Sequence, residues 1–264
     1  MFFESHAHYD DPRFDSDREE LLGSFRENGV DYVINVGADI QSSEASVKLA
    51  DKFDFIYSAV GVHPHGANSL NEEGLEKLRH LCGMRKVVAF GEIGLDFHYD
   101  YSPREDQRYW FKRQLELAER LNLPVIIHSR EAAAETFSII ESSKVRQGVI
   151  HCYSGSAEMA LDYVKMGFYI GIGGVITFEK TKKLKDVVET IPLERILIET
   201  DSPYLAPAPY RGERNNSKYL TFIATKIAEI KNISIQNVAN VTFLNTIRAF
   251  CLEIKINPKE IIKK

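Results

Sequence analysis

The amino-acid sequence predicts an α/β protein, a single (β/α)8 barrel of the TIM type with an extra C-terminal helix. First, eight short apolar runs rich in β-branched residues alternate with helical patterns along most of the chain. Second, the runs are continuously apolar, as at 125–127, which is typical of parallel strands covered on both faces. Third, a length of 264 residues suits one such barrel, so we expect one domain over 1–264. An open, doubly wound sheet is the alternative architecture.

The apolar runs and the periodic segments between them place each element in order. The predicted strands are residues 2–5, 32–36, 56–62, 87–90, 125–127, 148–151, 168–172 and 196–199. The helices that alternate with them are expected at 17–28, 41–52, 71–81, 104–121, 131–142, 157–166 and 180–190. The clearest is 104–121, where Trp110, Phe111 and Leu115 belong to an apolar side opposite the charged residues. Two more helices are expected at 218–231 and 235–252, the second as the addition to the repeat.

The composition limits the classes of function. The chain is 44% hydrophobic and 27% charged with a net charge of −5, which argues against broad electrostatic wrapping of nucleic acid. It leaves open a nucleic-acid substrate held through bound cations and a few arginines. No apolar run approaches the roughly 18 residues of a membrane span, and the acidic N-terminus predicts no signal peptide. The cysteines are few and widely spaced, so we expect reduced thiols and a cytoplasmic protein.

Candidate metal ligands gather where the predicted strands end. His6 and His8 come at the end of the first strand, two residues apart, and by the side-chain alternation of a strand they project to one face. Glu92 follows the fourth strand and Asp201 follows the eighth. Of the eight histidines in the chain, five fall at such ends: His6, His8, His63, His128 and His151. In a barrel all these ends meet at one rim, where active sites are built.

Histidine and carboxylate ligands without convergent cysteines suit Zn, Mn, Fe or Mg ions. The four imidazoles of His6, His8, His128 and His151, with Glu92 and Asp201, exceed what one catalytic metal with an open position needs. Two metals that share a bridging ligand are therefore favoured, and Glu92 on the central strand is the natural bridge. The alternative is a rim of histidines satisfied by protein groups, without a metal.

A pair of metal ions suits phosphoryl chemistry, because it can activate water and stabilise the attacking and leaving oxygens. Asp201 is the candidate acceptor of the proton of the water. Arg130, Arg211 and Arg214 lie beyond the fifth and eighth strands and could hold phosphate oxygens. Taken alone, each arginine is more often a surface or capping residue.

Five segments, in order along the chain, resemble motifs of the TatD-type metal-dependent deoxyribonucleases. They are GVHPH at 61–65, GEIGLD at 91–96, PVIIHSR at 124–130, HCYSG at 151–155 and ETDSPYLAP at 199–207. The resemblance extends from His6 to Asn215, and it implies a TIM-type barrel, hydrolysis of DNA phosphodiesters and two divalent cations. The sequence departs from the pattern at Glu4 and Glu131, where Asp is usual, and at 216–217, where Asn-Ser replaces Glu-Pro.

The resemblance also implies roles for individual residues. One cation would be held by His6, His8, Glu92 and Asp201. The other would be held by Glu92, His128 and His151. The residues implied to lie near the substrate are His63, Arg130 and Arg211.

The sequence thus predicts a deoxyribonuclease that uses two divalent ions (Mg²⁺, Mn²⁺ or Zn²⁺) and acts on DNA, with no membrane and no obligate protein partner. One alternative is a dinuclear-metal amidohydrolase or lactonase acting on a small-molecule ester or amide. Many dinuclear relatives bridge their metals with a carboxylated lysine on the fourth strand, whereas this chain has Glu92 there. A metal-binding scaffold without catalysis is the third reading, and the presence of Asp201 argues against it.

Overall fold

Eight parallel strands form one sheet in sequential order, which confirms the predicted barrel. The computed structural model describes residues 1–254, so the last ten residues of the predicted domain lie outside the described residues. The strands are β1 (Phe2–Ala7), β2 (Val30–Val36), β3 (Ile56–Val60), β4 (Val87–Asp96), β5 (Val125–Arg130), β6 (Gly148–Ile150), β7 (Tyr169–Ile172) and β8 (Ile196–Ile198).

The sheet closes where the segment after β8 meets the end of β1. Ala7 forms a parallel bridge with Ser202. The His8 N–H donates to the Ser202 carbonyl at 2.8 Å, and the Asp201 N–H donates to the His6 carbonyl at 3.0 Å. The alternative of an open sheet is therefore wrong, and the first and last candidate ligands are neighbours because of this closure.

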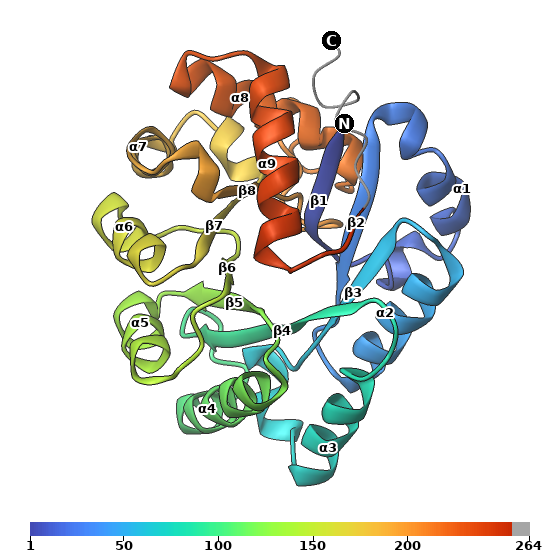
Figure 1. The fold of residues 1–264 in the computed structure, drawn as a ribbon, viewed down its shortest axis with the longest axis vertical. Helices are drawn as coiled ribbons and strands as arrows, with labels where there is room; N and C mark the ends of the chain where they lie inside the picture. Colours follow the sequence, from blue (N-terminus) through green and yellow to red (C-terminus); the bar gives the residue numbers. More distant parts are fainter. Residues whose placement is uncertain (255–264) are drawn as a thin grey trace.

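Helices surround the strands in chain order (Figure 1). The α-helices are α1 (Arg18–Gly23), α2 (Ile40–Lys52), α3 (Glu72–Leu81), α4 (Arg104–Leu121), α5 (Ala133–Ser142), α6 (Ala157–Lys165), α7 (Lys182–Thr190), α8 (Leu220–Lys231) and α9 (Ile235–Ala249). Short 3-10 helices are η1 (Pro12–Phe14), η2 (Arg26–Asn28), η3 (Pro64–Ser69), η4 (Gly174–Thr177), η5 (Leu193–Arg195) and η6 (Ser217–Tyr219). Within residues 1–254, no helix has the length and apolarity needed to cross a membrane.

The first predicted helix, 17–28, is shorter in the structure. α1 ends at Gly23, and a separate 3-10 turn follows. The Ser24 hydroxyl donates to the Leu21 carbonyl at 2.6 Å, which offers that carbonyl a partner other than the next helical N–H. Local side-chain hydrogen bonding thus ends a helix that periodicity alone extends.

Strand β4 continues six residues beyond the predicted end at 90, to Asp96. Its pairing with β5 shifts register between Phe90 and Ile93, so the strand passes through Gly91 and Glu92 without ending there. Gly94 has φ of +148°, and a Cβ atom there would lie 1.9 Å from the His128 carbonyl oxygen. Glycine therefore allows close approach to β5 here and does not terminate the strand.

Replacing Gly94 with alanine is expected to destabilise the protein by more than about 2 kcal/mol, because strain from positive φ adds to overlap with the β5 backbone. Chemical denaturation of the purified variant measures this loss. Gly23→Ala is the matched control, since a Cβ at Gly23 meets nothing within 4 Å and alanine favours the helix. Equal stability of Gly94→Ala and Gly23→Ala would contradict the close approach.

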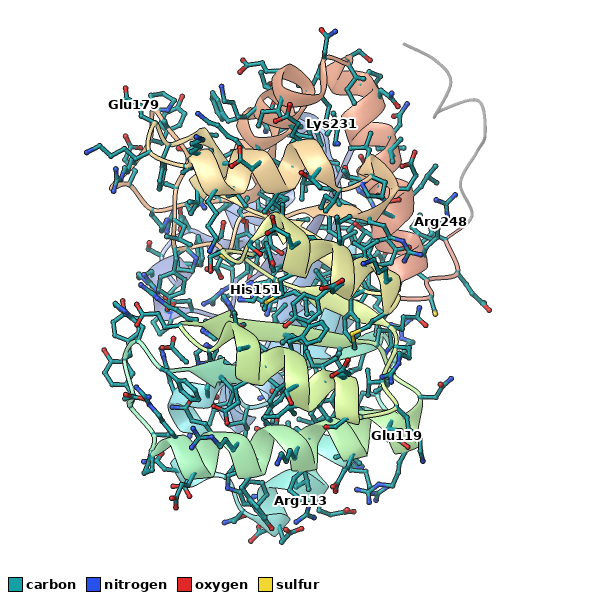
Figure 2. The ribbon with its side chains drawn as sticks, turned by 90° about the vertical axis from the view of Figure 1, so that its left-hand side faces the viewer. Arg113, Glu119, His151, Glu179, Lys231 and Arg248 are labelled. Carbon is teal, nitrogen blue, oxygen red and sulfur yellow. The ribbon has the colours of Figure 1, made fainter. Side chains whose placement is uncertain are left out.

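The inside of the barrel is filled by side chains and covered at one end by α9. Phe3, Ile126 and Leu197 point inward and pack with Phe243 and Phe250 from the C-terminal segment. The predicted extra helix therefore covers the amino ends of the strands. In the side view, Glu179, in a loop beyond β7, and Arg248, near the end of α9, lie on opposite sides of the molecule (Figure 2). The candidate ligands occupy the end of the barrel that α9 leaves open.

Candidate metal centre

Glu92 lies at the middle of the predicted ligands, and its Oε2 atom faces the end of β1. The distance from Oε2 to the Nε2 atom is 3.3 Å for His6 and 3.7 Å for His8. The two Nε2 atoms are 3.1 Å apart. Asp201 joins this group, with Oδ1 at 3.4 Å from His8 Nε2 and 3.7 Å from His6 Nε2. The closure of the barrel brings all four side chains together.

The Oε1 atom of Glu92 faces a second set of imidazoles, from the ends of β3, β5 and β6. It lies 2.8 Å from His151 Nε2 and 2.9 Å from His128 Nδ1. His63 Nε2 is 3.6 Å away. His63 thus lies beside this set of imidazoles, and its role near the substrate stays a prediction. The two oxygens of one carboxylate serve two different groups of ring nitrogens.

Hydrogen bonds on the outer side hold two of these rings in place. The Val36 carbonyl can only accept, so His8 Nδ1–H donates to it, at 2.7 Å. His128 Nε2 lies 3.0 Å from the Asp96 carboxylate, where it donates its proton. With these outer nitrogens protonated, the nitrogen of each ring that faces Glu92 can give its lone pair to a cation, because hydrogen bonds to the outer nitrogen orient metal-binding histidines in this way.

The charges of the centre favour a cation between the carboxylates and the rings. Burial lowers the pKa of His8, but the hydrogen bond and charge of Asp201 raise it to about 9. Burial opposes ionisation of Glu92, yet the surrounding imidazoles, His151 foremost, hold its pKa well below the usual range. The buried negative charge of the carboxylates is thus stabilised by nearby positive charge. Divalent cations can supply that charge while the imidazoles stay neutral. The donor set fits such ions.

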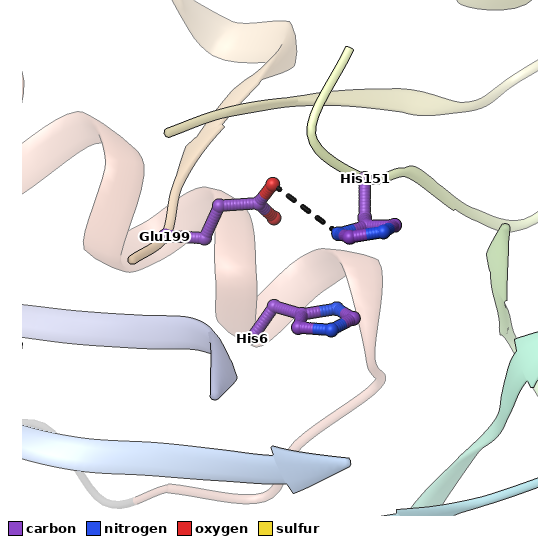
Figure 3. A group of neighbouring side chains, drawn as sticks. All are labelled: His6, His151 and Glu199. Carbon is purple, nitrogen blue, oxygen red and sulfur yellow. Dashed lines mark ion pairs between the residues drawn. The ribbon is translucent and has the colours of Figure 1, made fainter. Parts of the chain in front are cut away.

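Buried polar atoms without hydrogen-bond partners lie on the same side of the centre. Among the described residues these include His6 Nδ1, His151 Nδ1 and Glu199 Oε2. The rings of His6 and His151 stack with centroids 4.0 Å apart, and Glu199 Oε1 lies 3.6 Å from His151 Nδ1 (Figure 3). Unpaired buried polar atoms are costly. These ring nitrogens and this carboxylate oxygen have lone pairs, and His6, His151 and Glu199 form a group that could coordinate an ion.

Two carboxylates of the site, Asp96 and Glu199, are absent from the predicted set. Asp96 accepts from both His65 and His128, with 3.0 Å to each Nε2 atom. Glu199 is fully buried. Side-chain alternation could have found both, because Asp96 follows Glu92 by four residues and Glu199 precedes Asp201 by two. Asp96 was expected beyond the end of its strand, which hid the signal.

The three predicted arginines are not part of the donor cluster. Arg130 is exposed at the end of β5 and lies over the Tyr99 ring, with 4.7 Å from its guanidinium carbon to the ring centroid. Arg211 lies over Phe178 at 4.6 Å. Arg214 pairs with the Asp17 carboxylate, at 2.8 and 2.5 Å. Arg130 and Arg211 keep their charges at the rim, whereas the charge of Arg214 is already paired.

Two departures from the family pattern, Glu4 and Ser217, are in contact. Glu4 is fully buried, and Ser217 Oγ donates to its Oε2 atom at 2.8 Å. Thr200 also donates to Glu4, through its N–H at 2.8 Å and its hydroxyl at 2.6 Å. Burial raises the pKa of Glu4 to about 8, against the lowering effect of these hydrogen bonds. This network ties β1 to the loop after β8, behind the ligands.

Comparisons with known proteins test the resemblance of this chain to the TatD-type family. A family model described as TatD related DNase matches residues 3–251. An uncharacterized metal-dependent hydrolase of Bacillus subtilis (strain 168), YabD, is 40% identical over 252 residues, covering 95% of this chain and 99% of that protein. The 3'-5' ssDNA/RNA exonuclease TatD of Cronobacter sakazakii is 36% identical over 225 residues, covering 82% and 85%.

A solved structure of the same family has a closely similar fold. The crystal structure of YjjV, a TatD homolog from Escherichia coli K12, aligns with a TM-score of 0.91 and 31% identity, covering 95% of this chain and 98% of that one. The resemblance carried by the five motifs is confirmed, and the chain belongs to the TatD-related DNase family of metal-dependent hydrolases.

Proposed function

We propose that this protein is a divalent-metal-dependent deoxyribonuclease that hydrolyses DNA phosphodiester bonds with water as the nucleophile. The observation that carries the proposal is the position of Glu92. Its Oε2 atom faces His6 and His8, and its Oε1 atom faces His128 and His151. A carboxylate with separate donor groups at its two oxygens suits a bridge between two cations, and two-metal sites are typical of nucleases and phosphatases.

The proposed ligands fall into two sets that share Glu92. His6, His8 and Asp201 would complete one set, and His128 and His151 the other. When bound, two divalent ions (Mg²⁺, Mn²⁺ or Zn²⁺) would lower the pKa of water and neutralise charge on the phosphate oxygens. His63 stands beside the second set, with its Nδ1 atom accepting the His65 N–H at 3.1 Å.

Asp201 is the proposed acceptor of the water proton. Its side chain is 16% exposed, compared with 4% for Glu92, and Glu199 is fully buried. Of these three carboxylates, Asp201 therefore has the best access to a substrate arriving from the open rim. Its Oδ1 atom, near His8 and His6, is the atom that would take the proton.

Arg130 and Arg211 are the proposed phosphate contacts. Both guanidinium groups lie over aromatic rings on loops beyond strand ends, Arg130 over Tyr99 and Arg211 over Phe178. A planar guanidinium can bind two oxygens of one phosphate, and stacking on a ring holds its plane in place.

An activity assay separates this proposal from its alternative. A 5'-labelled single-stranded oligonucleotide and its duplex are incubated with the protein and Mg²⁺, Mn²⁺ or Zn²⁺. We expect the labelled strand to be cut into fragments, and we expect EDTA in the reaction to prevent this cleavage. The name of the Cronobacter relative, an exonuclease for single-stranded DNA and RNA, supports including both nucleic acids. Intact oligonucleotides together with consumption of a lactone or amide would reject the nuclease in favour of a small-molecule hydrolase.

Glu199→Gln tests the carboxylate behind His151. We expect metal affinity to fall about 10- to 100-fold, because removing the charge that faces His151 Nδ1 weakens the orientation of that ring. Isothermal titration of the metal-free protein with Mn²⁺ measures the change. Glu189→Gln, on the exposed side of α7, is the control and should bind Mn²⁺ like the unmodified protein. Identical affinity in both variants would remove Glu199 from the site.

A further inference from the structure

Two tyrosines in the loop after β4 leave much of their surface open beside the metal centre. Tyr99 is 44% exposed and Tyr101 is 64% exposed. Their rings are nearly parallel, at 10°, with centroids 5.2 Å apart. Arg130 lies over Tyr99 at 4.7 Å. The result is a small aromatic stack with a cation at one side, which we call the tyrosine stack (Tyr99, Tyr101 and Arg130).

The loop that carries the tyrosine stack is held at both ends. Asp96 Oδ1 accepts the backbone N–H groups of His98 and Tyr99, both at 3.0 Å. At the other end, the Ser102 hydroxyl donates to the His65 carbonyl at 2.8 Å, and the Ser102 carbonyl accepts from Gln107 at 2.9 Å. The backbone on both sides of the two tyrosines is thus held before any ligand arrives, which reduces the entropy lost on binding.

The same residues connect the tyrosine stack to the centre. The His65 ring contacts Tyr101 edge-on, with centroids 4.8 Å apart. His65 Nε2 lies 3.0 Å from Asp96 Oδ2, and this oxygen also faces His128 Nε2 at 3.0 Å. Only His65 and Asp96 therefore separate Tyr101 from a proposed metal ligand. A group seated on Tyr101 would thus lie two side chains away from His128, whose Nδ1 atom is 2.9 Å from Glu92.

Other exposed tyrosines do not offer the same arrangement. Tyr204 has the Arg13 guanidinium over its ring at 4.2 Å, but its aromatic neighbour among the described residues is His8, which it meets edge-on, so no parallel ring backs it. Tyr109 lies on α4, where its hydroxyl accepts from Arg113 at 2.9 Å. Arg113 is on the outer helix, away from His151 (Figure 2). Tyr101 combines large exposure, a backing ring and proximity to the centre.

We propose that the tyrosine stack binds an unpaired nucleobase next to the phosphodiester to be cut, with Tyr101 as the contacting ring. This inference rests on the proposed nuclease function. Every base has a π-face that can stack on an aromatic side chain, and a neighbouring arginine adds a cation and a phosphate contact. Inside a duplex both faces of each base are covered by neighbours. The tyrosine stack therefore selects single-stranded or frayed DNA without reading its sequence.

Cleavage kinetics on oligonucleotides with and without bases test the tyrosine stack. Tyr101→Ala is expected to raise KM for a single-stranded oligonucleotide about 10- to 100-fold, the loss of one base–aromatic stack. Tyr101→Phe keeps the ring and should keep the KM. Tyr109→Ala is the matched control, because it removes an exposed tyrosine from α4 and should change nothing. An oligonucleotide of abasic residues has the same phosphates without bases, so Tyr101→Ala and the unmodified protein should cut it equally.

A binding signal independent of turnover completes the test. In an Asp201→Asn background with Mg²⁺, an oligonucleotide containing 2-aminopurine should lose fluorescence when that base stacks on Tyr101. Adding Tyr101→Ala should abolish the quenching, and adding Tyr101→Phe should retain it. If the unmodified protein cuts DNA but Tyr101→Ala matches it in KM and quenching, the stacking inference is wrong. If the unmodified protein cuts no oligonucleotide, the nuclease proposal itself fails.

Discussion

The Asp201→Asn variant is expected to hydrolyse oligonucleotides about 10²- to 10⁴-fold more slowly in kcat, the usual contribution of a positioned proton acceptor. The amide cannot accept the water proton, but it occupies the same volume beside His8 and His6. Asparagine is preferred to alanine because Asp201 has φ of +56°, a conformation that Asn tolerates better than most residues. Single-turnover cleavage of the labelled strand measures the loss.

Two comparisons make the Asp201 result decisive. Asp186→Asn, on the exposed side of α7, changes the same charge outside the site and should leave kcat unaltered. Thermal unfolding of Asp201→Asn should match that of the unmodified protein to within a few degrees. Near-normal kcat in a folded Asp201→Asn variant would exclude Asp201 as the proton acceptor.

Glu92→Gln is expected to lower the number of bound divalent ions below the two that we propose. We also expect hydrolysis to fall more than about 100-fold, since losing a metal ligand should matter more than losing a group that only orients a ligand. The physical reason is that both oxygens of Glu92 face imidazole nitrogens, so one substitution weakens both sets of ligands. A neutral amide also removes buried negative charge that would balance the cations. Elemental analysis after extensive dialysis gives the stoichiometry.

The control for Glu92→Gln is Glu116→Gln on α4, where the side chain is 60% exposed and pairs with Arg113 across the helix surface. It should retain two ions and full turnover. Retention of two ions by Glu92→Gln would refute a bridging role. Loss of one ion together with normal hydrolysis would show instead that a single cation is sufficient for the reaction.

The order of elements was predictable from the sequence because each element carries its own local pattern. Continuous apolar runs and one-sided helices depend on neighbours within about ten residues, and the barrel follows from their alternation. Boundaries set by particular hydrogen bonds were not predictable in the same way. α1 ends early where the Ser24 hydroxyl bonds to Leu21, and β4 continues because Gly94 lets it lie against His128.

The candidate site likewise has features that could be predicted from the sequence and features that could not. That histidines and carboxylates follow the strands can be read from the residue order alone, and parallel strands must bring their carboxyl ends to one rim. The folded barrel was needed to show that the two oxygens of Glu92 face different imidazoles, and that Asp96 and Glu199 contact His128 and His151. Such distances depend on register between strands and on closure of the barrel. These are set by pairings between distant residues such as Ala7 and Ser202, on which local sequence patterns carry no information.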